Sequence, residues 1–310
     1  MDASEIEQGL GLWSETAGGR ATLINVSENH TYRIDAPAGR FVLRLHRPGY
    51  QSATAIRSEL AFIDSLRMSL PVPQALPGVD GELLQPVAAG RTAVLFAHEP
   101  GIEPAEDADL LPLFRTLGRY AATAHAHVQA WNRPGWFHRP TWTIGSILDP
   151  DGPWGDWRQA PGVSGDVRER LAQADRELRE RFAGYGATSA NYGLIHADMR
   201  LANVLVDGDH VTLIDFDDCG FCWFLYDLAA SLSFIEMRPD LDALIAAWRA
   251  GYESRRSLSA EDVEMIGPMI LLRRMALTAW IGSHADTDLA RRQAPSFAAD
   301  TATLADRLLR

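Results

Sequence analysis

Acidic and amide side chains gather around short apolar runs in the middle of this chain. The stretch LIHADMRLANVLVDGDHVTLIDFDD begins at Leu194 and ends at Asp218. It contains His196, Asp198, Asn203 and Asp215 in that order. A carboxylate held beside a dry sheet is unfavourable unless a cation compensates its charge. The pattern therefore predicts that a magnesium–nucleotide complex supplies the cation.

The order of these polar groups matches the requirements of phosphoryl transfer. One carboxylate must accept a hydroxyl proton, an amide oxygen must hold a metal, and a second carboxylate must bridge that metal to the outer phosphates. Asp198 suits the first role, Asn203 the second and Asp215 the third. An aspartate-rich surface hairpin is the alternative, because a short pattern can arise by chance. The agreement of the spacing, the flanking strands and the upstream segment favours phosphoryl transfer.

Short β-branched runs are expected to position these residues. The runs GLI, NVLV and VTLI predict three strands, and Asp207-Gly208-Asp209 predicts a hairpin turn between the last two. The polar residues then fall at strand ends and are expected to face one place.

The N-terminal third predicts a small antiparallel sheet. Three alternating strands are expected between Ala21 and Arg47. A helix should follow, with Ser52 or Thr54 as its cap, because its apolar residues recur at helical spacing. A further strand, TAVLFAHEPG, ends at Pro100-Gly101, where a hinge is expected.

Beyond this point the pattern is mainly helical. One long helix should carry His125 and His127 as packing or capping groups, and helices should continue from Tyr226 to the end, with interruptions at Pro239 and Pro268. The prediction is an α+β, two-lobed fold. Residues 1–98 form a small sheet lobe with one helix that binds nucleotide, and residues 99–310 form a larger helical lobe with the catalytic loop and acceptor site.

Composition excludes several classes of protein. The 310 residues are 46% hydrophobic and 23% charged, with a formal net charge of −12. A nucleic-acid partner is not expected, because phosphate contacts need clustered Lys and Arg. Neither a signal peptide nor a membrane span is evident, which predicts a cytoplasmic protein. Cys219 and Cys222 lack a second Cys/His pair that would complete a zinc site, and we assign them no function.

The central motifs resemble a known family. His196-x-Asp198-x-x-x-x-Asn203, LIDFDD, and YDLA at Tyr226 to Ala229 are similar to the aminoglycoside phosphotransferase superfamily. That superfamily includes choline, homoserine and bacterial stress-response kinases, and the likeness is strongest to the bacterial branch near the last two. It implies a protein-kinase-like fold, ATP and Mg²⁺, Asp198 as catalytic base, and Asn203 and Asp215 as magnesium ligands.

The resemblance also implies supporting roles. His196 would be structural, and Asp227 would brace the loop or a helix start. Arg44, at a position where a lysine is usual, would bind the α- and β-phosphates with Glu59 as its ion-pair partner. The alternative is an exposed ion pair, which would contribute under about 1 kcal/mol.

The nucleotide's two ends are expected at different segments. The turn SENHTY contains no glycine, but Ser27, Asn29 and Thr31 offer hydroxyl and amide donors to the phosphates. The adenine is expected to bind backbone groups of the hinge strand between Ala97 and Glu99.

Arg200 stands two residues after Asp198, where hydroxyl-directed protein kinases carry a lysine that contacts the transferred phosphate. A guanidinium there would stabilise charge on the equatorial oxygens. The alternative is a surface arginine paired with Asp217 or Asp218.

The sequence does not identify the molecule that accepts the phosphate. Five tryptophans between residues 131 and 157 are mostly expected to be packing anchors, with some lining the acceptor pocket, and Arg139 is a candidate for binding a substrate carboxylate. A small alcohol is the first hypothesis: an amino alcohol, a hydroxy amino acid or an aminocyclitol sugar. A protein Ser/Thr kinase and a nucleotide-binding pseudokinase are the others.

Overall fold

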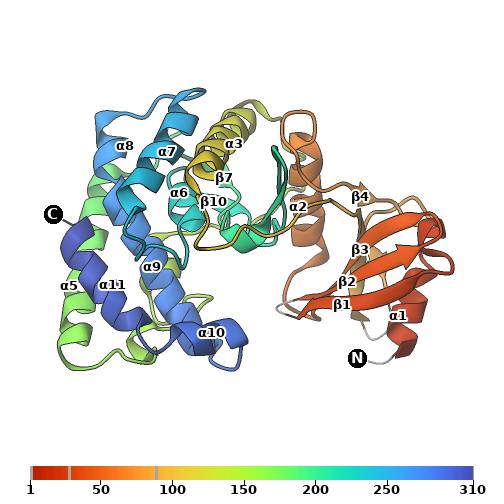
Figure 1. The fold of residues 1–310 in the computed structure, drawn as a ribbon, viewed down its shortest axis with the longest axis horizontal. Coiled ribbons are helices and arrows are strands. Elements are labelled where there is room, and N and C mark those ends of the chain that lie inside the picture. Colours follow the sequence, from red (N-terminus) through yellow and green to blue (C-terminus); the bar gives the residue numbers. More distant parts are fainter. Residues whose placement is uncertain (1–2, 27–28, 88–89, 310) are drawn as a thin grey trace. The chain divides into compact units, whose positions relative to one another are not determined.

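Figure 1 shows the computed structural model, which describes residues 3–26, 29–87 and 90–309. The chain forms two compact units. Unit 1 consists of Met1–Glu103, Trp131–Arg139 and Val204–Asp217, and unit 2 of Pro104–Ala130, Pro140–Asn203 and Asp218–Arg310. Two later segments therefore fold with the N-terminal sheet. The boundary at residue 98 between two contiguous lobes stays a prediction.

Unit 1 is built on an antiparallel sheet with the strand order β1-β2-β3-β6-β4, in which β5 also pairs with β6. Its strands are β1 (Arg20–Val26), β2 (Asn29–Ala36), β3 (Gly39–His46), β4 (Ala75–Leu76), β5 (Gln85–Pro86) and β6 (Thr92–Ala97). The first three strands are those that alternation predicted. Gly39, which pairs with Ala36, has a φ of 144°, a backbone region where side chains are rarely tolerated.

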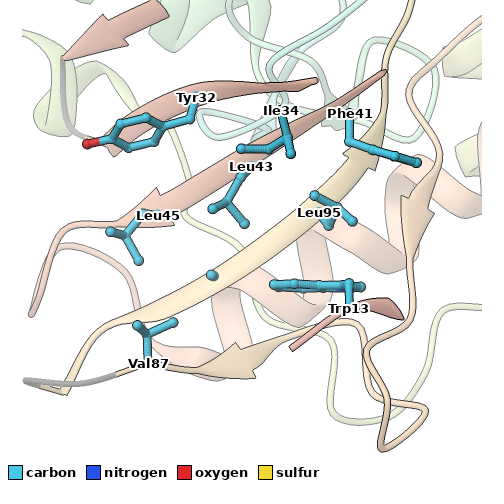
Figure 2. Close-up of a cluster of buried hydrophobic side chains, with 9 residues drawn as sticks. Trp13, Tyr32, Ile34, Phe41, Leu43, Leu45, Val87 and Leu95 are labelled. Atoms are coloured by element: carbon cyan, nitrogen blue, oxygen red, sulfur yellow. The ribbon is translucent and has the colours of Figure 1, made fainter. Parts of the chain in front are cut away.

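One face of this sheet carries the core of unit 1. Ile34, Leu43 and Leu95 come from three neighbouring strands and lie near the Trp13 ring (Figure 2). The Trp13 indole N–H donates to the carbonyl oxygen of Leu76 at 2.9 Å, which satisfies its one polar atom. The inward residues of β2, β3 and β6 thus form a single apolar layer, whereas β1 is mostly exposed.

Unit 1 also contains helices and a hairpin: α1 (Ala3–Leu10), the 3₁₀ turn η1 (Ser14–Thr16), α2 (Ala53–Leu66), β8 (Val204–Asp207) and β9 (His210–Leu213). Ser52 caps α2, because its hydroxyl accepts from the Ala55 N–H at 3.1 Å. Phe62 of α2 packs edge-on against Phe216, with ring centroids 5.7 Å apart. The predicted hairpin forms, and Gly208 in its turn has a φ of 58°.

Unit 2 is mainly helical. Its elements are α3 (Leu111–Ala130), α4 (Ile144–Leu148), η3 (Trp157–Gln159), α5 (Gly165–Tyr185), β7 (Tyr192–Ile195), η4 (Leu201–Asn203), β10 (Gly220–Trp223), α6 (Tyr226–Ser231), α7 (Leu241–Glu253), α8 (Ala260–Glu264), α9 (Ile266–Ser283), α10 (Asp288–Gln293) and α11 (Phe297–Leu308). Helices α3 and α7 pack against each other (Figure 1).

Two features of the helices follow from local sequence. Gly118 of α3 lies against the backbone of Trp248 in α7, and Gly251 of α7 lies against the backbone of Arg115, so each helix presents a glycine to the other. Pro268 lies in the first turn of α9, where a missing N–H is tolerated. The expected interruption therefore falls before it, at Met265.

Across the described residues, none of the helices is both long and apolar enough to cross a bilayer.

Candidate active site

The loop that carries Asp198 leaves β7 and is braced from α6. Ala197 has a φ of 69°, a conformation that costs a residue with a Cβ about 1–2 kcal/mol. Asp227 holds this turn, because its carboxylate accepts from the backbone N–H of Ala197 at 2.7 Å and of His196 at 3.3 Å. His125 contacts the same carboxylate at 3.0 Å. Asp227 thus adopts the bracing position that the sequence predicted.

Asp198 lies at the centre of a charged cluster in unit 2. Arg273 donates to its Oδ1, while Arg200 Nε and Asn203 Nδ2 donate to its Oδ2 at 3.2 Å and 2.6 Å. Burial raises the pKa of Asp198, but Arg273 and Arg200 lower it more, so the pKa lies below its ordinary value. The carboxylate is therefore ionised at neutral pH and is an acceptor only.

Asn203 is oriented by the same loop. Its Nδ2 donates to the backbone oxygen and to a carboxylate oxygen of Asp198, at 2.9 Å and 2.6 Å. Among the described residues, no hydrogen bond involves its Oδ1. An amide oxygen is a hard ligand of the kind that Mg²⁺ binds.

Arg273 is a site residue that the sequence did not reveal. It lies in α9, which the sequence showed only as an apolar run ended by two arginines. Its Nε donates to Ser233 Oγ at 3.0 Å, and its guanidinium lies over the rings of Trp154 and Tyr226, at 5.2 Å and 5.7 Å from their centroids. The sequence did contain one indication that Arg273 has an acidic partner, because an arginine at an apolar position of a buried helix needs an anion.

A second group of charged residues lies in unit 1. Arg44 of β3 donates to Glu59 of α2 at 2.6 Å, and its other terminal nitrogen is 3.6 Å from Asp215 Oδ1. The predicted Arg44–Glu59 pair is present and buried, so it is not the exposed pair of the alternative. Asp215 has a φ of 61°, and half of its side chain is exposed.

The three predicted phosphate donors differ in their surroundings. Asn29 donates through Nδ2 to Asp217 Oδ2 at 3.1 Å, so its amide N–H group is engaged by the carboxylate loop. Thr31 pairs with Arg44 across β2 and β3. Ser27 lies outside the described residues. Asp217 is itself buried, and its Oδ1 has no hydrogen-bond partner among the described residues.

The hinge strand uses part of its backbone within unit 1. The Ala97 N–H donates to the Gln74 carbonyl oxygen at 2.9 Å, and the His98 N–H to that of Arg40 at 3.3 Å. Over the described part of the chain, the Glu99 N–H makes no backbone hydrogen bond. Of the expected range, the Glu99 end is thus better suited to a base than the Ala97 N–H.

Arg139 does not fit its expected role. It is 3% exposed, and its guanidinium donates to the carbonyl oxygens of Ala55, at 3.1 Å, and Asp217. Those bonds hold unit 1 together and leave the side chain unsuited to a substrate carboxylate. Arg200 pairs with Asp198 at 3.2 Å, and within the described parts of the chain it forms no ion pair with Asp217 or Asp218.

Two tryptophans of the central segment are packing anchors, as expected for most of the five, and a place for any of the others in the acceptor pocket stays a prediction. Trp157 is buried, and its indole N–H donates to Asp175 at 3.2 Å. Trp142 is also buried, donates to the Asp218 carbonyl oxygen at 3.0 Å and packs on Trp154. Cys219 and Cys222 are buried free thiols.

Comparisons with known proteins show the family of this chain. Residues 21–261 match the phosphotransferase enzyme family, and the chain therefore belongs to that family. The homoserine kinase of Pseudomonas aeruginosa PAO1 is 32% identical over 258 residues, covering 77% of this chain and 72% of that protein. The amicoumacin kinase of Bacillus subtilis strain 168 is 25% identical over 267 residues, covering 81% and 76%.

A solved structure of a microcompartment-associated aminopropanol kinase is also similar. It is 38% identical to this chain, with a TM-score of 0.90, and the match covers 99% of this chain and 98% of that one. The predicted two-lobed, protein-kinase-like fold class is confirmed. The chain is an ATP-dependent phosphotransferase that acts on a hydroxyl group.

Proposed function

We propose that this protein phosphorylates the hydroxyl of a short amino alcohol with ATP and Mg²⁺. The observation that carries the acceptor class is the full-length likeness to the aminopropanol kinase structure. The Asp198 cluster supports the reaction type, because it supplies an ionised acceptor for the hydroxyl proton flanked by two guanidinium groups.

In the proposed mechanism Asp198 orients the acceptor hydroxyl and takes its proton. A carboxylate with a lowered pKa is a weak base, so the proton moves late, after the bond to phosphorus has begun to form. Arg200 is 29% exposed and donates to Asp198 through Nε only. Its remaining donors can contact the equatorial oxygens of the transferred group and stabilise their charge.

The nucleotide and metal are assigned to residues that fit them. Arg44, fixed by Glu59, would hold the α- and β-phosphates, with Ser27 and Thr31 as further donors. Asn203 and Asp215 offer an amide oxygen and a half-exposed carboxylate, which suit Mg²⁺ as a hard cation. The bound metal would neutralise charge on the outer phosphates.

Groups that could attract the ammonium of an acceptor lie in the surroundings of Asp198. Asp218 adds a negative charge that acts on both Arg273 and Tyr226, and Trp154 presents an aromatic ring beside the same arginine. Carboxylates and aromatic faces both attract an ammonium group.

A hydroxy amino acid is the second candidate, favoured by the homoserine kinase of 32% identity. The two acceptors share an ammonium and a hydroxyl and differ in a carboxylate. The test is to incubate the protein with Mg-ATP and either 1-amino-2-propanol, ethanolamine or homoserine, and to identify phosphorylated products by ³¹P NMR.

We expect the amino alcohols to be phosphorylated with kcat/KM at least about tenfold above that of homoserine, since the aminopropanol kinase resembles this chain at higher identity and over more of its length than the homoserine kinase does. Asp198→Asn is the control and should lose at least about 100-fold in kcat while still binding ATP. Preference for homoserine would contradict the acceptor class. Transfer to a protein substrate alone, or ATP binding with no transfer, would contradict the proposed function.

A further inference from the structure

Arg273 is a buried arginine in the middle of α9. The residue is 2% exposed, and most of the helix around it is apolar and buried. A guanidinium in such a place is strongly unfavourable unless anions and acceptors pair with its donors. The contacts of Arg273 therefore show what its burial achieves.

Three groups fix the guanidinium independently of Asp198. Ser233 Oγ accepts from its Nε at 3.0 Å, and the rings of Trp154 and Tyr226 lie within 5.2 Å and 5.7 Å of it. A planar cation held by a hydroxyl and two rings has little freedom to turn. The position of Nη2 is thus set by α9 and its neighbours before any substrate binds.

The adjacent arginine makes a useful contrast. Arg274 donates to Glu236 at 2.6 Å, and that glutamate is fully buried, so the pair is closed off. The partner of Arg273 is different, because the side chain of Asp198 remains 14% exposed. Two neighbouring arginines thus form one purely internal ion pair and one ion pair with the reactive carboxylate.

The two arginines that contact Asp198 also differ from each other. Arg273 contacts Oδ1 and has a side chain that is 3% exposed, whereas Arg200 contacts Oδ2 and is 29% exposed. A partly exposed side chain can leave its partner at small cost, but a buried one cannot. If Arg200 shifts toward a phosphoryl group, Arg273 would therefore remain on Asp198.

We propose that Arg273 is a positioning residue, which holds the Asp198 carboxylate in the orientation that receives the acceptor hydroxyl and leaves Arg200 free for the transferred phosphoryl group. This inference rests on the proposed function for the reaction but not for the identity of the acceptor. It assigns to α9, a helix far along the chain from the catalytic loop, a direct part in setting the geometry of that loop.

The test compares Arg273→Ala with Arg273→Lys in steady-state kinetics. Loss of orientation should lower kcat about 100-fold in the alanine variant and leave the KM for ATP within about threefold. Arg273→Lys keeps the positive charge on a single donor group, so its kcat should be about tenfold above that of Arg273→Ala. Millimolar methylguanidinium should also raise the kcat of Arg273→Ala.

The matched control is Arg274→Ala, on the same helix and equally buried. It should lower Tm, since Glu236 is left buried and unpaired, but keep kcat within about threefold of the wild type. If Arg273→Ala does not fold, Ser233→Ala removes only the hydroxyl that holds Nε, and it should lower kcat about three- to tenfold at nearly unchanged Tm. A folded Arg273→Ala with wild-type kcat, or a loss equal to that of Arg274→Ala, overturns the inference. If Arg273→Ala cannot be obtained, a wild-type kcat in Ser233→Ala also overturns the inference.

Failure of the proposed function is recognised separately. A wild-type protein that phosphorylates no acceptor has no kcat to compare, and crystal structures of wild type and Arg273→Ala, or of Ser233→Ala, then decide. An Asp198 side chain that keeps its wild-type rotamer and order without the arginine contradicts the positioning role, and a displaced carboxylate supports it.

Discussion

The surroundings of Asp198, the proposed catalytic carboxylate, are defined by its partners more than by its own position in the sequence. Asp198 accepts from two arginines and an asparagine, and each arises from a different local context: the catalytic loop, the 3₁₀ turn η4 and helix α9. The first two lie within five residues of Asp198, so spacing places them near it, although the sequence predicted Arg200 to contact the phosphate or to pair with Asp217 or Asp218. The third is 75 residues away, and no local pattern marks it.

Arg200 provides the prediction at the scale of one residue. Arg200→Ala should lower kcat by about 10²–10³-fold, the usual loss on removing one donor from a transition-state oxyanion, with the KM for ATP changed less than about threefold. Initial rates at saturating acceptor measure this. Arg176→Ala on α5 makes the same change in charge and is the control. An Arg200→Ala variant with unaltered kcat would refute the role of Arg200 in stabilising the transferred group.

The elements of the fold could largely be predicted from periodicity and turn residues. The sheet strands β1 to β3, the Ser52 cap and the β8–β9 hairpin follow from alternation, capping and turn chemistry. The pairing of β7 could not be foreseen, because it joins β10 across 25 or more residues and not the hairpin that follows it. Strand partners distant in sequence depend on packing, which a single sequence does not display.

The approach of α3 to α7 provides the prediction at the scale of elements. A Cβ at Gly118 would overlap the Trp248 carbonyl oxygen, so Gly118→Ala must push the helices apart. We expect a loss of about 1–3 kcal/mol in the free energy of unfolding. Thermal unfolding followed by circular dichroism measures it.

Gly184→Ala is the matched control for that experiment. Gly184 lies in helix α5 with no atom near the position of an added Cβ, so alanine there should stabilise by about 0.5–1 kcal/mol. Opposite signs for the two glycines are the expected result. Equal effects would mean that helix propensity, and not the contact between α3 and α7, determines the change.

At the scale of the whole molecule, the chain passes repeatedly between its two units, and each unit contains some of the residues that the sequence predicted for the site. Arg44, Glu59 and Asp215 belong to unit 1, whereas Asp198 and Asn203 belong to unit 2. The contiguous lobes expected from the sequence could not show this. A short hairpin carries no signal for which core it will join, because its apolar face suits either.

Two buried histidines are expected to make the stability of the fold depend on acid. His46, at the end of β3, is 3% exposed, and neither ring nitrogen has a hydrogen-bond partner among the described residues. Burial, assisted by the charge of Arg44, lowers its pKa to about 2. Burial also lowers the pKa of His125, so this histidine likewise makes the folded protein less stable in acid.

The consequence for stability follows from proton linkage. Above pH of about 6.5 both folded and unfolded His46 are neutral, and the residue adds no pH dependence. Below that pH the unfolded chain binds a proton that the folded chain does not, so stability falls by about 1.4 kcal/mol per pH unit for this histidine. His46→Leu removes the proton-binding group from both states and should remove that slope.

We therefore expect His46→Leu to gain about 2 kcal/mol relative to the wild type between pH 6.5 and pH 5, measured by calorimetry of unfolding at several pH values. The control is His210→Leu, which removes an exposed histidine from the start of β9 and should keep the wild-type dependence. A gap between His46→Leu and wild type that stays constant over this range would show that His46 binds protons equally in the folded and unfolded chains, which contradicts its burial in the neutral form.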